Sequence, residues 1–160
     1  AMELKTVEQI QKEQHIRFIK VDEKAIVPTK ATDGACCFDL YSVEEKEILP
    51  QKVVLVKTGI KGKVPENFEV QVRSRSGLAL KHGIMVLNSP GTIDSDYLGE
   101  WGVVLYNVSD KPFKVEVGMR VAQAKISACV TMQFVEITPE EFAEIDTVRG
   151  EGGYNSTGLK

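Results

Sequence analysis

The amino-acid sequence predicts an all-β fold, a sandwich or barrel built from short strands. Three segments alternate apolar and polar residues with a period of two, which is typical of strands that bury one face: 68–73, 113–117 and 126–134. Glycine and proline recur at short intervals between these segments, as between the strands of antiparallel domains. A fourth segment, 101–108, is apolar on both faces, so we expect a strand covered on both sides by core or by a neighbouring subunit.

Only two helices are expected. Thr138-Pro-Glu-Glu141 combines an N-cap hydroxyl, a proline at the first helical position and a glutamate at the third, which predicts a short helix to about Asp146. Thr6-Val-Glu-Gln9 is a weaker version of the same pattern, and it opens a helical extension before the first strand near His15.

After Thr147 the chain is rich in glycine and almost free of aliphatic side chains, so this segment forms no core of its own. We expect an arm that becomes ordered on another surface. The predicted organisation is therefore an N-terminal extension over 1–14, a β-barrel domain over 15–147 and a C-terminal arm over 148–160.

Composition limits the classes of function. The 160 residues, 42% of them hydrophobic, suit one ordinary domain with a sizeable core. The net charge of −3, without a run of five like charges, argues against direct binding of nucleic acid, so any phosphate site must be local. No apolar run approaches the ~18 residues of a membrane span, and Cys36, Cys37 and Cys129 lack metal-ligand spacing. We expect a cytoplasmic protein that binds no membrane.

Two segments carry groups suited to chemistry. Residues 91–99 place the carboxylate of Asp94 in a turn flanked by glycines, where the backbone can approach a ligand closely and a water can be held. Residues 149–158 offer backbone amides, two hydroxyls, a guanidinium and one aromatic ring, which suit a polyphosphate and a stacked base. Together they predict a site for a nucleoside triphosphate.

Five segments resemble, in order and spacing, the five motifs of the trimeric deoxyuridine triphosphatases. They are Ala31–Leu40, Arg73–Leu80, Asn88–Gly99, Gly118–Gln123 and Arg149–Gly158. The resemblance implies a distorted jelly-roll-like β-barrel with one short helix and a swapped C-terminal arm, assembled as a homotrimer. It also implies hydrolysis of dUTP to dUMP and pyrophosphate, which limits uracil incorporation into DNA and supplies dUMP for thymidylate synthesis.

The resemblance further implies roles for the nucleoside-binding residues. Asp94 would hold the attacking water and take its proton; the alternative is an aspartate that only caps its own turn. Tyr97 would lie under the deoxyribose, where a 2′-hydroxyl clashes, unless it is an ordinary strand residue. Uracil would be read by the backbone of a hairpin from Gly83 to Asp94 that leaves too little room for a 5-methyl group. The substrate contacts in this hairpin are Asn88, Gly91 and Ile93.

For the triphosphate, the resemblance implies contacts from Arg75, Ser76 and Gly77, which supply a guanidinium, a hydroxyl and an approachable amide. Gln123 would lie near the α-phosphate. Arg73 and Arg120 are either further phosphate contacts or solvated strand residues.

The C-terminal arm would close the site, with Arg149, Ser156 and Thr157 on the γ-phosphate and Tyr154 stacked on uracil. Mg²⁺ would be chelated mainly by the triphosphate, and Asp39 would contact it only through water.

Two alternatives remain. The related dCTP deaminases share the fold and the triphosphate contacts, but their chemistry needs a glutamate on the strand after the Tyr97 motif, and 102–107 holds no carboxylate. A different class is a regulatory protein in which the N-terminal extension docks a protein partner.

Overall fold

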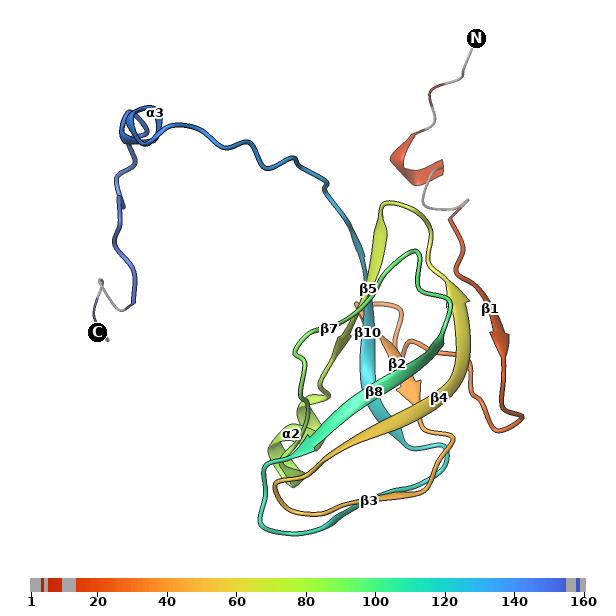
Figure 1. The fold of residues 1–160 in the computed structure, drawn as a ribbon. Coiled ribbons are helices and arrows are strands. Elements are labelled where there is room, and N and C mark those ends of the chain that lie inside the picture. Colours follow the sequence, from red (N-terminus) through yellow and green to blue (C-terminus); the bar gives the residue numbers. More distant parts are fainter. Residues whose placement is uncertain (1–3, 5, 10–13, 155–157, 159–160) are drawn as a thin grey trace. The chain divides into compact units, whose positions relative to one another are not determined.

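The computed structural model describes residues 4, 6–9, 14–154 and 158. The chain forms two compact units, residues 1–130 and 131–160, and the described strands all lie in the first (Figure 1). The three-part division expected from the sequence stays a prediction. In the described part of the chain, no helix is long and apolar enough to cross a membrane.

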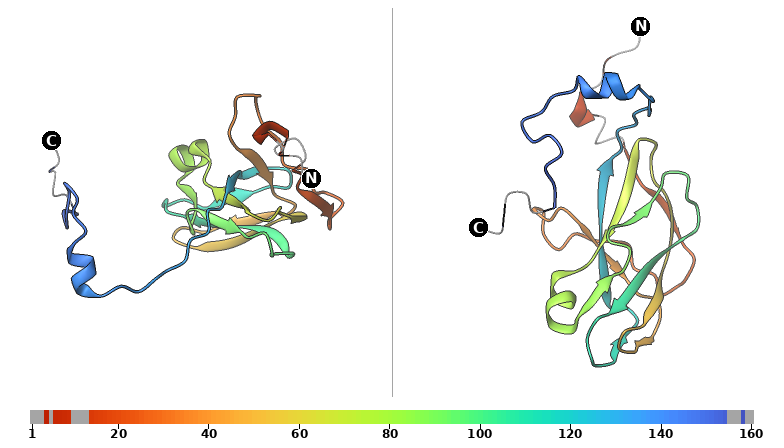
Figure 2. Two further views of the ribbon diagram at one scale, coloured as in Figure 1. Left: turned by 90° about the horizontal axis from the view of Figure 1, so that it is seen from above. Right: turned by 60° about the vertical axis from the view of Figure 1, so that its left-hand side comes forward.

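Two four-stranded antiparallel sheets form the first unit (Figures 1 and 2). Sheet A has the order β1 (Arg17–Lys20), β4 (Val53–Lys63), β8 (Glu100–Asn107), β6 (Ile84–Val86). Sheet B has the order β2 (Phe38–Tyr41), β10 (Arg120–Ala128), β5 (Phe68–Arg73), β7 (Gly91–Ile93). A small ribbon pairs β3 (Lys46–Ile48) with β9 (Phe113–Val115). The all-β prediction is therefore confirmed.

The core is made by the inner faces of both sheets. In β8, Trp101, Val103 and Leu105 are almost fully buried, while the residues between them are half-buried. This alternation confirms the strand expected over 101–108, but its second face is only partly covered within this chain. The alternating segment at 68–73 is confirmed as β5, whereas only the first part of the segment at 113–117 forms a strand, β9, and Val117 is exposed.

The third alternating segment was predicted to bury one face as far as Phe134, and that prediction is wrong for this chain. β10 ends at Ala128, and beyond it Val130, Met132 and Phe134 are exposed. The period-two pattern identifies an apolar face, but the described residues of the same chain do not cover it.

The capping pattern at Thr138 is confirmed. In α3 (Pro139–Ala143) the Glu141 N–H donates to Thr138 Oγ1 at 3.1 Å, and the Thr138 N–H donates to Glu141 Oε2 at 2.8 Å. The helix ends three residues before the expected Asp146. Thr6 and Gln9 form the same reciprocal pair, and residues 7–9 are helical.

A further helix, α2 (Ser76–His82), contradicts the expectation of only two. It was missed because Arg75 at its N-cap makes no side-chain capping bond and none of its residues is buried, so it shows no apolar period. Its end does carry a signal: Lys81 and His82 lie in the last turn, and Gly83 follows with φ 65°, a left-handed conformation that favours glycine.

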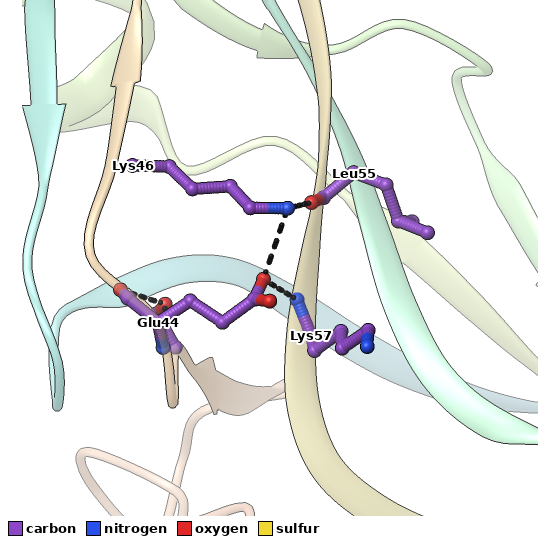
Figure 3. Close-up of polar contacts among 5 residues, drawn as sticks. Glu44, Lys46, Leu55 and Lys57 are labelled. Atoms are coloured by element: carbon purple, nitrogen blue, oxygen red, sulfur yellow. Dashed lines mark hydrogen bonds and ion pairs between the residues drawn. The ribbon is translucent and has the colours of Figure 1, made fainter.

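A bulge interrupts β4 between Lys57 and Lys61, where the pairing with β8 shifts register. Beside the bulge, the N–H of Lys57 donates to Glu44 Oε2 at 2.9 Å, and Lys46 Nζ lies 3.2 Å from the same oxygen (Figure 3). Burial acts to raise the pKa of Glu44, but these two contacts outweigh it and leave that pKa below its usual value. Glu44 thus holds the bulge in place as a carboxylate.

Candidate functional site

Sheet B aligns three of the motifs on neighbouring strands. Gln123 on β10 pairs with Asp39 on β2 and with Arg73 on β5. A β-bulge between Arg120 and Ala122 adds one residue to β10, so that Arg120 pairs with Tyr41. Arg120 therefore lies on the same face of the sheet as Gln123, although the two are an odd number of positions apart in the sequence.

The resulting group, here called the phosphate cluster, comprises Asp39, Arg75, Arg120 and Gln123. Arg75 Nε lies 3.4 Å from Asp39 Oδ1, and Arg120 Nη1 lies 3.7 Å from Asp39 Oδ2. Arg75 also donates from Nη1 to the Arg120 carbonyl at 3.2 Å. Two guanidinium groups thus face one carboxylate, which leaves a local excess of one positive charge in an acidic chain.

The residues around the cluster complete this half of the site. Gln123 donates from Nε2 to the Ser74 carbonyl at 2.9 Å, which fixes its side chain beside Arg75. Ser76 and Gly77 open α2 and are exposed, and a side chain at 77 would meet no atom within 4 Å. Arg73 instead donates to its own strand neighbour Gln71 at 2.9 Å.

The expected hairpin over 83–94 is wrong as a pair of hydrogen-bonded strands. Its first half, β6, pairs with β8 in sheet A, and its second half, β7, pairs with β5 in sheet B. Each half finds a longer partner than the other half offers, so the segment crosses from one sheet to the other. Asn88 still lies over Gly91: a Cβ at 91 would be 3.4 Å from Asn88 Nδ2.

Asp94 follows β7 in a turn and is exposed. The Tyr97 N–H donates to the Asp94 carbonyl at 3.1 Å, and Lys63 on β4 donates to the carbonyl of Ser95. Ile93, the residue before Asp94, is buried in the core. The carboxylate is therefore presented to solvent by a turn that is held from both sides.

The ring of Tyr97 lies over Gly99, and its hydroxyl donates to the Glu100 carbonyl at 3.1 Å. A cavity of about 500 Å³ lies beside this ring. It is lined by Leu55, Lys57, Lys61, Thr92, Ile93, Tyr97, Glu100, Trp101 and Gly102. Within the described part of the chain, the buried Oε2 of Glu100 has no hydrogen-bond partner.

The phosphate cluster and the Asp94 turn lie apart in one chain. Ile93 pairs with Val70, three residues from Arg73, which places it about 10 Å along β5 from the row of the cluster. β2 and β7 are three strand spacings apart, or about 14 Å. The backbones of Asp39 and Ile93 are therefore about 17 Å apart.

Two predicted arm residues are described in the second unit. Arg149 donates from Nε to the Gly152 carbonyl at 2.6 Å, and the Tyr154 side chain is fully exposed. Ser156 and Thr157 lie outside the described residues.

Sequence reasoning left Arg120 open and missed Ser74, Lys63 and Glu100. For Arg120 the bulge in β10, which the alternation does not reveal, decides its face. Ser74 lies inside the Arg73–Leu80 motif, and this position in the sequence could have indicated it. Nothing in the sequence around Lys63 or Glu100 indicates that they lie at the site.

Cys36, Cys37 and Cys129 are free, and burial raises the pKa of the Cys37 thiol. Among the described residues, no three His, Cys, Asp or Glu side chains are grouped to hold a metal ion.

Comparison with known proteins identifies close relatives. The chain is 49% identical over 140 residues to the deoxyuridine 5′-triphosphate nucleotidohydrolase of Clostridium novyi, covering 88% of this chain and 96% of the relative. It is equally identical over 144 residues to the enzyme of that name from Helicobacter pylori, covering 90% and 97%.

Solved structures share the fold. A mutant dUTPase of Staphylococcus bacteriophage 80alpha with dUpNHpp matches with a TM-score of 0.82 at 23% identity, over 91% of this chain and 99% of that one. A mutant dUTPase from phage phi11 of S. aureus, described as coordinating a structural Mg(II) ion, matches with a TM-score of 0.72 at 19% identity over 77% and 96%. The dUTPase family model matches residues 23–158, and the chain therefore belongs to the dUTPase family.

Proposed function

We propose that this chain hydrolyses dUTP to dUMP and pyrophosphate, with water activated by Asp94 attacking the α-phosphorus. The observation that carries the reaction is the identity of about one residue in two with enzymes named for it, over nearly their whole length. The observed geometry supports the roles of the individual residues.

The phosphate cluster supplies the charge that a triphosphate needs. Arg75 and Arg120 share the single carboxylate of Asp39 at 3.4 and 3.7 Å, distances longer than those of tight ion pairs. A bound triphosphate offers both guanidiniums stronger acceptors. The carbonyl of Ser74, next in sequence to Arg75, holds the side-chain amide of Gln123 by a 2.9 Å hydrogen bond, where this amide would contact the α-phosphate.

Asp94 fits a general base because its carboxylate is exposed while its backbone is fixed. The Asp94–Tyr97 turn and the Lys63 contact hold its position, and the buried Ile93 anchors the strand before it. A base must lie within hydrogen-bond reach of the water that it deprotonates. Attack breaks the bond between the α-phosphorus and the bridging oxygen, and pyrophosphate leaves.

Selection of the nucleoside is assigned to Asn88, Gly91 and Tyr97. The absence of a side chain at 91 lets the Asn88 loop approach β7 closely, and backbone groups can then pair with the uracil edge. The ring of Tyr97 would fill the space that a 2′-hydroxyl requires. A ribonucleotide and a 5-methylated base would thus be rejected by different parts of the segment.

Mg²⁺ fits the edge of the phosphate cluster. Mg²⁺ usually keeps several waters and binds through one or two carboxylates and the substrate phosphates. Asp39 offers one carboxylate, mostly buried and already surrounded by the phosphate-binding arginines. The ion would neutralise charge on the triphosphate, while Asp39 would hold its waters.

The active site is proposed to be shared between chains of a homotrimer. The base must reach the α-phosphorus that the phosphate cluster holds, yet Asp39 and Ile93 are about 17 Å apart in one chain. Two copies related by a symmetry axis can bring the cluster of one chain to the Asp94 turn of the next. In the second unit, the exposed apolar side chains of Met132 and Phe134 offer further surface for a second copy.

The test is pyrophosphate release measured separately with dUTP, UTP, dTTP and dCTP. We expect turnover of dUTP alone, loss of turnover on removal of 149–160, and a trimeric mass by light scattering. Comparable turnover of dTTP or UTP would contradict the assigned specificity, and a fully active monomer would contradict the shared site.

A second candidate reaction, deamination of dCTP, is favoured by one observation. β8 begins at Glu100, two residues before the segment that was found to lack a carboxylate, and the buried Oε2 of Glu100 is unpartnered within the described residues. Ammonia release from dCTP, lost in Glu100→Gln, would support this reaction. If no ammonia is released from dCTP, deamination is excluded and dUTP hydrolysis is the one remaining proposed reaction.

A further inference from the structure

Ser74 lies between the phosphate cluster and the nucleoside-binding segment of its own chain and is hydrogen-bonded toward each through a different atom. It follows β5 of sheet B and directly precedes Arg75. Its carbonyl accepts a hydrogen bond from Gln123 Nε2 at 2.9 Å, and its side-chain Oγ accepts one from the Val86 N–H at 2.9 Å.

The second of these bonds joins the two sheets. Val86 is the last residue of β6, the edge strand of sheet A, and it is almost fully buried. The next amide, that of Leu87, donates to the Val104 carbonyl on β8, so Val86 directs its own N–H away from that strand. Ser74 Oγ supplies the acceptor that this buried donor requires.

The two hydrogen-bond partners of Ser74, Val86 and Gln123, lie close in sequence to, or are themselves, proposed substrate contacts. The loop over 87–90 between β6 and β7, here called the base-reading loop, contains Asn88 and starts at the anchored end of β6. Gln123 and Arg75 belong to the phosphate cluster. Displacement of the chain at Ser74 would therefore move both groups at once.

We propose that Ser74 is a positioning residue that holds the base-reading loop and the phosphate cluster in fixed register. This inference rests on the proposed function and extends it from the substrate contacts to a residue behind them. Because the two halves of one chain serve different sites of the proposed trimer, a change at Ser74 affects the nucleoside half of one site and the phosphate half of the next.

The test uses the full-length protein and two fragments of the substrate. Binding of dUMP and of pyrophosphate is measured separately by calorimetry, together with kcat and KM for dUTP. Ser74→Ala leaves the Val86 N–H unpaired, and we expect affinity for both fragments to fall and kcat/KM for dUTP to drop about tenfold. Ser74→Thr keeps the hydroxyl and should restore all three quantities.

Ser109→Ala is the matched control, because it removes a hydroxyl that donates to Asn107 Oδ1 at 2.7 Å in the turn after β8. We expect a lower melting temperature with unchanged fragment affinities. If Ser74→Ala does not fold, Ser74→Cys, which keeps a weaker acceptor, should give an intermediate loss.

The outcomes separate the two proposals. An active wild type together with an equally active, equally binding Ser74→Ala variant would overturn the positioning role alone. Loss of affinity for only one fragment, or no rescue by threonine, would also overturn it. A wild type that does not hydrolyse dUTP would overturn the proposed function and this inference with it.

Discussion

The ring of Tyr97 occupies the space that a side chain at Gly99 would need: a Cβ at 99 would lie 2.5 Å from Cζ of that ring. Gly99→Ala must therefore move the ring, whose position is proposed to exclude a 2′-hydroxyl. We expect the ratio of kcat/KM for dUTP over UTP to fall, as it should in Tyr97→Ala, while the dUTP over dTTP ratio changes less.

The matched control for this prediction is Gly34→Ala, because a Cβ at 34 meets no atom within 4 Å. It should leave both ratios unchanged. An unchanged dUTP over UTP ratio in Gly99→Ala and Tyr97→Ala would show that the ring only packs.

Asp94→Asn should abolish most turnover while the protein still binds dUTP. Loss of a general base usually lowers the rate by about 10²–10⁴, and asparagine preserves the shape of the side chain. Single-turnover rates and the affinity for a non-hydrolysable dUTP analogue measure the two effects. Asp96→Asn, in the same exposed turn, should keep most of the rate; more than half of wild-type kcat in Asp94→Asn would exclude it as the base.

Two inactive variants should complement one another in mixed trimers. Asp94→Asn and Arg75→Ala remove groups from the two separated halves of a chain, so co-expression allows a site to combine an intact half from each. About a quarter of the sites in an equal mixture should be complete. The measurement is the specific activity of purified mixed trimers against each homotrimer, and no gain over the homotrimers would place both groups in one chain.

Glu44→Gln should destabilise the protein at neutral pH and much less in acid. The Lys57 N–H and Lys46 hold the folded-state pKa of Glu44 below its usual value, so the carboxylate stabilises the fold fully above the unfolded-state pKa. This stabilisation is lost as the pH falls through the lowered folded-state pKa. Urea midpoints of wild type and variant, measured from pH 7 to pH 3, should therefore converge at the acidic end.

Glu45→Gln is the control for the Glu44 prediction. Its carboxylate lies 3.9 Å from Lys114 Nζ with both side chains about two-thirds exposed, a geometry that contributes little. Its urea midpoint should match that of wild type at every pH. A constant difference between wild type and Glu44→Gln across the range would mean that the amide fails for steric reasons.

The sequence pattern predicted a helix or strand correctly where the element is determined by residues close together in the sequence. The helix at Thr138 follows from the reciprocal bonds between Thr138 and Glu141, with a proline at the first helical position between them, and β5 and β9 follow from their alternation. By contrast, α2 lacks both a side-chain cap and a buried face, so its local sequence gives little indication of it. Beyond Ala128, the alternating apolar residues predicted a buried strand face, but the pattern does not say which part of the protein would bury it, and in this chain these residues are exposed.

The sequence by itself determined the all-β class, the order of the five motifs and the chemical groups available to bind a nucleoside triphosphate, because these depend on residue type and spacing. Only the tertiary structure decided which of those groups meet. A single extra residue in β10 turns Arg120 toward Asp39, whereas Arg73 turns to Gln71. Strand register places Asp94 far from that cluster in the same chain, because side-chain proximity in a sheet depends on pairing between strands, which no single strand specifies.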